Sequence, residues 1–156
     1  MNAIDCIVLN LEEVRRRSII VWESIPEHYM NWRPDPDALS IKEMIRHVLD
    51  SEHYYHLCLL NEGSLITYDS PYEKRTFTTL KDELDFSRTY RNAFIDKIKS
   101  YGEDDLSRIQ IDRSDVGYIR TLGDMLLRIA YHEAVHSGQL LDYLRSAELK
   151  RPKVWD

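Results

Sequence analysis

Apolar residues recur every three or four positions along four stretches of this chain, which is the period of an amphipathic helix. The first stretch covers residues 4–25 and ends at Pro26, which cannot continue a helix. Its apolar positions are Ile4, Ile7, Val8, Leu11, Val14, Val21, Trp22 and Ile25. The pattern therefore predicts a long first helix with one face directed to a core.

Each of the three further stretches begins with a hydroxyl residue that can cap a helix, followed three positions later by an acidic residue. The pairs are Ser40 with Glu43, Thr79 with Asp82, and Thr121 with Asp124. The second and third stretches end near Gly63 and Gly102, where glycine favours the end of a helix. The last apolar stripe reaches Leu144. These signals predict three more helices.

The connections at residues 64–78 and 103–120 are longer, and neither shows a convincing strand-length alternation of apolar and polar residues. Four helices of similar length predict an all-α fold, a four-helix bundle with two longer irregular connections. We expect a single domain over residues 1–156. The pattern leaves open whether the helices simply alternate up and down or cross over. Because bundles commonly hold metal ions between facing helices, histidines in the apolar stripes become candidate ligands.

Two histidines, His132 and His136, are spaced i, i+4 in the stripe of the last helix. That spacing puts both imidazoles on one face, about 5–6 Å apart at Cβ, so that both can reach one ion. With Ile129 as the centre of the stripe, they lie about 60° and 20° from it and are predicted to face the core. The spacing alone is compatible with a shared metal ion and equally with two buried neutral histidines bonded to nearby hydroxyls.

A third histidine, His47, lies at the edge of the stripe on the second helix, where a residue can line a cleft between helices. Three neutral imidazoles would leave a coordination position open, as in catalytic zinc sites. His53 and His56 are rotated about 120° and 180° from His47, so we expect them to pack elsewhere. Cys58 lies about 16 Å further along the helix and is predicted to be a small buried residue.

Glu133 directly follows His132, and the sequence leaves its role open. It could orient a ligand histidine, accept a proton, or pair with an arginine from another helix. No serine or cysteine is placed with a histidine base as a covalent nucleophile. Any chemistry at this site would therefore belong to the metal ion.

The net charge of -6 argues against nonspecific nucleic-acid binding, which needs a basic surface. The densest cationic run, residues 15–17, is flanked by glutamates and is predicted to be a solvated helix face. No apolar run approaches the ~20 residues of a membrane span. The first apolar segment precedes this basic run, so no signal peptide is expected. Two cysteines are too few for a disulfide framework, which makes the reducing cytoplasm the expected location.

Taken together, these residues resemble the DinB-like (YfiT-type) family of metal-binding four-helix bundles. The matching pieces are Trp32-Arg33-Pro34, Ser40-Ile41 leading to His47, and residues 132–140. The family pattern has one histidine on the second helix and an H-x-x-x-H pair on the last, followed closely by Gly-Gln. It maps onto His47, His132, His136, Gly138 and Gln139. Ser137 is a departure, because relatives often carry arginine there.

The resemblance implies a divalent metal ion held by His47, His132 and His136, most often nickel or zinc, with iron or manganese also compatible with imidazole ligands. It also implies a homodimer. The leading function is a low-molecular-weight-thiol S-transferase of the bacillithiol type, acting on electrophilic small molecules. A metal-dependent hydrolase at the same site and a non-catalytic metal- or ligand-binding stress-response protein are the alternatives. Glu133 and Gln139 are the candidates to support the ligand histidines.

Overall fold

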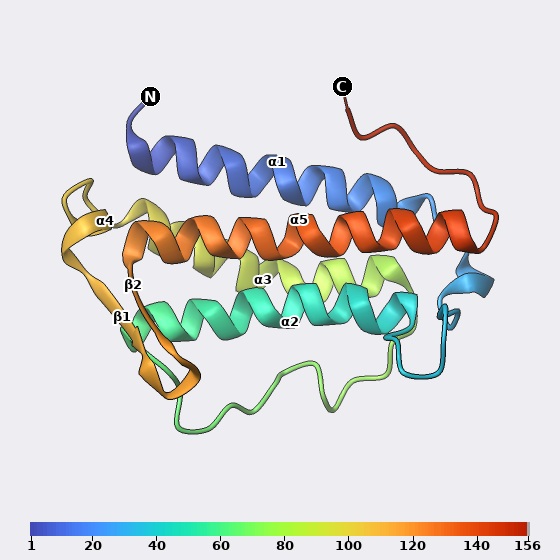
Figure 1. Cartoon of the computed structure of the whole chain (residues 1–156), viewed down its shortest axis with the longest axis horizontal. Coiled ribbons are helices and arrows are strands. Elements are labelled where there is room, and N and C mark those ends of the chain that lie inside the picture. Colours follow the sequence, from blue (N-terminus) through green and yellow to red (C-terminus); the bar gives the residue numbers. More distant parts are fainter. Residues whose placement is uncertain (156) are drawn as a thin grey trace.

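The computed structural model describes residues 1–155, and four long helices form a bundle (Figure 1). They are α1 (Ala3–Glu23), α2 (Ile41–Leu60), α3 (Leu80–Lys99) and α5 (Leu122–Ser146). The connections hold two 3-10 turns, Glu27–Tyr29 and Ser114–Val116, and the one-turn helix α4 (Asp105–Arg108). The predicted all-α four-helix bundle is confirmed.

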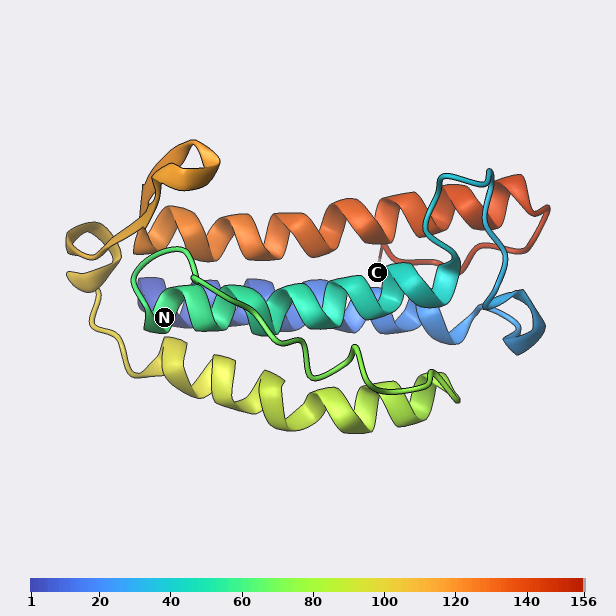
Figure 2. The ribbon, with the colours of Figure 1, turned by 90° about the horizontal axis from the view of Figure 1, so that it is seen from below.

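The four helices do not simply alternate up and down. α1 and α5 run in one direction and α2 and α3 in the other (Figure 1). The connection at residues 61–79 therefore runs back along the outside of the bundle, from the end of α2 to the start of the parallel helix α3 (Figure 2). α5 packs against α1 and α2, and α3 packs against the same two helices. The order around the bundle is thus α1, α5, α2, α3, a crossed topology that the sequence left open.

The predicted capping residues begin the helices. Ser40 and Glu43 form a reciprocal capping box at the start of α2. Thr79 and Thr121 each accept a hydrogen bond from the backbone N–H three residues later, at the starts of α3 and α5. Asn2 caps α1 in the same way, so that helix starts one residue earlier than the apolar pattern indicated. The helix ends at Glu23, shortly before Pro26.

The irregular connection predicted at residues 103–120 instead contains a β-hairpin. Strands β1 (Gln110–Arg113) and β2 (Tyr118–Thr121) pair antiparallel, and Gly117 in the left-handed region (φ 92°) ends the turn between them. Each strand has four residues, too few for a period of two to be recognised in the sequence. The hairpin projects from the bundle beside the start of α5 (Figure 2).

The core consists of two apolar clusters. One lies toward the hairpin and includes Leu11, Leu59, Phe94 and Leu126. The other lies toward the opposite end of the bundle and includes Trp22, Ile45, Leu49 and Leu140. On every long helix, the positions between the two clusters include a charged residue. Within residues 1–155, no helix is long and apolar enough to cross a membrane.

These charged residues form a buried layer, which we call the ionic layer: Arg15 of α1, Glu52 of α2, Arg91 of α3 and Glu133 of α5. Arg15 donates to both carboxylate oxygens of Glu133, from Nε at 2.7 Å and from Nη2 at 3.0 Å. The same Nη2 lies 3.3 Å from Glu52 Oε2, and Arg91 also pairs with Glu52. Burial pushes the pKa of Glu133 up, but the charge and hydrogen bonds of Arg15 reverse this and lower it.

The ionic layer corrects the interpretation of residues 15–17 as a solvated face. Arg15 is only 7% exposed and faces the core, whereas Arg17 lies at the surface with Glu13. The difference follows from the helix period, because Arg15 lies four residues after Leu11 and shares its face.

We predict that Arg15→Leu will lower the free energy of unfolding by about 3–5 kcal/mol, because it leaves Glu133 buried without its cation. Chemical denaturation with two independent probes measures this loss. Arg88→Leu is the matched control, since Arg88 pairs with Asp85 at an exposed position of α3 and should matter little. Equal stability of the Arg15 variant and the wild type would show that the ionic layer contributes nothing.

Candidate metal centre

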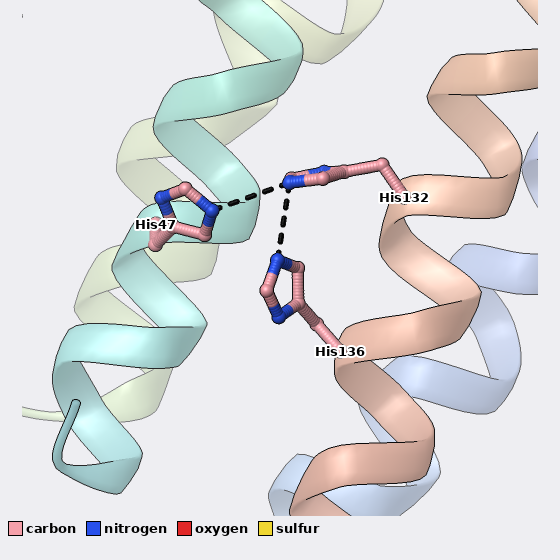
Figure 3. Close-up of side chains that lie close together, drawn as sticks. All are labelled: His47, His132 and His136. Atoms are coloured by element: carbon pink, nitrogen blue, oxygen red, sulfur yellow. Dashed lines mark hydrogen bonds between the residues drawn. The ribbon is translucent and has the colours of Figure 1, made fainter. Parts of the chain in front are cut away.

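Three histidines from two helices converge on one point. His47 projects from α2 and His132 and His136 from successive turns of α5, with their rings directed at one another (Figure 3). The Nε2 atom of His132 lies 3.2 Å from Nε2 of His47 and 3.1 Å from Nε2 of His136. One ring nitrogen from each residue lies within 4.8 Å of the other two.

This arrangement fits a divalent metal ion. Two imidazole nitrogens at about 2.0–2.1 Å from a tetrahedral zinc ion are about 3.3 Å apart, close to both Nε2 separations. Without an ion, His132 Nε2 faces two other ring nitrogens, and it can donate to one or accept from one. An ion would accept the lone pairs of all three. Among residues 1–155, His47, His132 and His136 are the group of side chains placed to hold one.

The surroundings of His132 and His47 favour the neutral imidazole, which is the form that binds metal. Burial is the largest cause that lowers the pKa of His132, to about 4, followed by the charges of His136 and His47. Burial and His136 also lower the pKa of His47, while Asp50 opposes the shift.

Gln139 orients one of the three rings. Its Oε1 atom lies 2.6 Å from His136 Nδ1, so Nδ1–H donates to it and the lone pair stays on Nε2. A hydrogen bond of this kind fixes the tautomer of a histidine that binds metal through its other nitrogen. The Gly138-Gln139 pair of the sequence pattern therefore has a structural counterpart in this contact.

Glu133 and Gln139 were the two residues expected to support the ligand histidines. For Glu133 this expectation is wrong. Its carboxylate points toward α1 and binds Arg15, one of the alternatives that the sequence had left open. The core-facing position of α5 at this level thus belongs to Glu133, which is 4% exposed. His132 and His136 are half-buried at the edge of that face. They were predicted to face the core and are more exposed than that prediction implied.

Residues 132–136 also match the H-E-x-x-H pattern, a match that goes beyond the i, i+4 spacing considered above. In zinc metalloproteases this pattern supplies two ligands and a glutamate general base. Here the glutamate is held in the core by Arg15 at 2.7 Å. It cannot act as a base toward a substrate at the histidines without breaking the ionic layer.

The remaining candidates lie apart from this centre, as predicted. His53 packs against Tyr90, with ring centroids 4.4 Å apart. His56 is buried against Phe94, and Cys58 is fully buried. Tyr55 also borders the centre, because its ring makes a T-shaped contact with the ring of His132, with centroids 5.9 Å apart. Its signal was its place in the apolar stripe of α2, two turns beyond His47.

Known proteins are similar to this chain in sequence and in fold. A model of the DinB superfamily matches residues 10–140. The uncharacterized protein YjoA of Bacillus subtilis is 27% identical over 124 residues, which cover 79% of this chain and 77% of that protein. The crystal structure of YjoA, described as a DinB-like protein, superposes with a TM-score of 0.69 at 22% identity and covers 95% of this chain and 96% of its own.

A second solved structure is YfiT of Bacillus subtilis, with a TM-score of 0.76 at 14% identity. The match covers 94% of this chain and 89% of YfiT. YfiT is described as a probable metal-dependent hydrolase with an unusual four-helix bundle topology. At this identity the likeness establishes the fold, which agrees with the crossed topology described above.

We predict that His132 of the metal-free protein titrates near pH 4, well below the ordinary histidine value of about 6.5. The unfolded chain then takes up this proton more readily, so the free energy of unfolding should fall as the pH drops from about 6.5 toward 4. NMR titration of the ring protons measures the pKa. His136→Ala removes the second-largest cause and should raise it. A His132 titration midpoint near 6.5 in both the wild type and His136→Ala would contradict the predicted effect of burial and of the neighbouring histidines.

Proposed function

The chain belongs to the DinB superfamily, and on that premise we propose that it is a metal-dependent enzyme whose divalent ion is held by His47, His132 and His136. The convergence of these three ring nitrogens from two helices carries the proposal. Nickel and zinc are the ions we favour, and iron and manganese suit the same ligands.

Three protein ligands leave at least one coordination position for a water molecule or a substrate, the feature that separates catalytic from structural sites. Among the described residues, no fourth histidine, cysteine or carboxylate joins the group. His47 is exposed, so a small molecule can approach from the surface. These observations favour a catalytic site over the alternative of a non-catalytic binding protein with a purely structural ion.

When bound there, a divalent ion lowers the pKa of a water or thiol ligand and so supplies a nucleophile at neutral pH. The chain contributes the lowered pKa of His132, a His136 tautomer fixed through Gln139, and the Tyr55 ring beside His132. Cys58 is no alternative nucleophile, because it is fully buried and burial raises the pKa of its thiol.

Two reactions fit this site. The first is transfer of a low-molecular-weight thiol of the bacillithiol type, in which the thiolate sulfur attacks an electrophilic carbon and the leaving group departs with the bonding electrons. The second is hydrolysis, in which water takes the place of the thiol. The description of the structural relative YfiT as a probable metal-dependent hydrolase favours the second. The resemblance to thiol-transferring bundles favours the first, which we keep as the leading proposal.

We predict that His47→Ala, His132→Ala and His136→Ala will each reduce bound metal sharply, because each removes one of three ligands. Metal content after equilibrium dialysis against nickel or zinc measures this. His53→Ala is the control, since His53 packs against Tyr90 and lies outside the group. Full occupancy in all three ligand variants would overturn the proposed centre.

We predict that the metal-loaded protein accelerates conjugation of a thiol to a chloro-aromatic acceptor, and that chelation or His136→Ala abolishes the acceleration. Bacillithiol, cysteine and glutathione are to be compared, with an activated ester in thiol-free buffer as the hydrolysis arm. Thiol-dependent product supports transfer, and ester cleavage that needs the metal supports hydrolysis. Equal rates for wild type and His136→Ala in both arms would leave the site without a catalytic role.

A further inference from the structure

An arginine extends the histidine stripe on α5 toward the hairpin. Arg128, His132 and His136 follow one another at i, i+4 spacing, so the three side chains emerge along one edge of the helix. Arg128 is one turn before His132, about 6 Å along the axis. Its positive charge is close enough to His132 to help lower the pKa of that imidazole.

Arg128 has no acidic partner within the described chain. It makes no hydrogen bond or ion pair among residues 1–155, and its Nε atom is buried without an acceptor. Its guanidinium instead lies over the ring of Tyr118 in β2, 5.0 Å from the centroid. A half-buried arginine with unused donors differs from the ionic layer, where Arg15 and Arg91 are both paired with carboxylates.

The hairpin brings two more arginines to the same tyrosine. The guanidinium groups of Arg113 and Arg120 lie 5.3 and 5.1 Å from the Tyr118 centroid. Arg120 is neutralised by Asp124 at 2.6 Å, although its Nε atom is also buried without a partner. Arg113 is buried and donates to hydroxyl groups, 2.7 Å to Tyr118 and 2.9 Å to Tyr54, with no carboxylate in ion-pair contact among the described residues.

This arginine cluster is continuous with the three histidines. Arg113 also lies 5.7 Å from the ring of Tyr55, and that ring packs against His132. The chain as a whole carries a net charge of -6, yet at this place two of three arginines lack an acidic partner. Such a concentration of positive charge beside an open site is suited to an anionic ligand, because it attracts and orients the opposite charge.

We propose that Arg128 binds an anionic group, a carboxylate or a phosphate, of the small molecule that reacts at the three-histidine centre. The inference rests on the proposed function and deepens it, since it assigns the substrate a negative charge about one helical turn from the reacting atom. Arginine suits this task because its planar donors match two oxygens of one carboxylate or phosphate. Arg113 holds Tyr118 in place beneath Arg128, and it is a positioning residue.

The test uses two thiols that differ only at one end. The thiol of each anchors the probe on the metal ion, so the comparison does not require that a thiol be the natural nucleophile. Cobalt(II)-loaded protein is titrated with 3-mercaptopropionate and with 3-mercapto-1-propanol, and the absorption band of thiolate bound to cobalt reports occupancy. We expect the wild type to bind the carboxylate about tenfold more tightly than the alcohol, the value of one charge-assisted hydrogen-bonded contact.

Arg128→Gln should remove this preference, while cobalt still binds at one ion per chain because all three histidine ligands remain. Arg145→Gln is the matched control, because it removes the same charge from an exposed position near the end of α5. It should keep the wild-type preference. An unchanged preference in Arg128→Gln, or an equal loss in Arg145→Gln, would overturn the assignment of the anion to Arg128.

A metal-free experiment separates this inference from the proposed function. The Nε–H resonance of Arg128 is followed by NMR during titration of the apo protein with acetate and, as the neutral control, acetamide. A saturable shift with acetate alone supports the anion site even if cobalt fails to bind, in which case only the metal-dependent function falls. No response to acetate, together with no carboxylate preference on the cobalt protein, would refute the anion site while leaving the metal centre intact.

Discussion

The buried ionic layer is the constraint on which the rest of the structure depends. A guanidinium and two carboxylates taken out of water are tolerated only where their hydrogen bonds are made with good geometry. Arg15 meets that condition by bonding Glu133 twice and approaching Glu52, and Arg91 completes the set. Since each member comes from a different helix, the layer specifies both the rotation and the axial register of all four helices.

The metal centre takes its geometry from that register. Glu133 is fixed toward α1, so the preceding residue, His132, is turned about 100° away, to the side of α5 that faces α2. There it meets His47, which lies five residues before Glu52 on α2. A shift of α5 by one residue would replace Glu133 in the core and carry both histidines away from His47. The same turn of α5 therefore contributes Glu133 to the ionic layer and His132 to the three-histidine centre.

The local signals were sufficient to predict the four helices, their caps at Ser40, Thr79 and Thr121, and the three histidines that meet. They depend on spacing within single helices, which a sequence displays directly. The crossed topology, the hairpin and the partner of Glu133 depend on contacts between distant segments, and the burial of Arg15 was hidden by the acidic residues around it. The homodimer, the thiol and the identity of the ion stay predictions, since none of them follows from the packing of one chain.

Two arginines at the hairpin side of this bundle differ from the arginines of the ionic layer in how their polar atoms are satisfied. In the ionic layer every charge has a partner, and Arg15, Glu52 and Glu133 are buried. On the hairpin side, Arg120 and Arg128 each bury an Nε atom with no acceptor, although Arg120 also pairs with Asp124. An unpaired buried donor costs about 1–3 kcal/mol, which a protein of marginal stability retains only for a reason. Under the proposed anion site, the ligand would supply the acceptor that Arg128 lacks, and the hairpin would contribute to substrate selection through the Tyr118 ring.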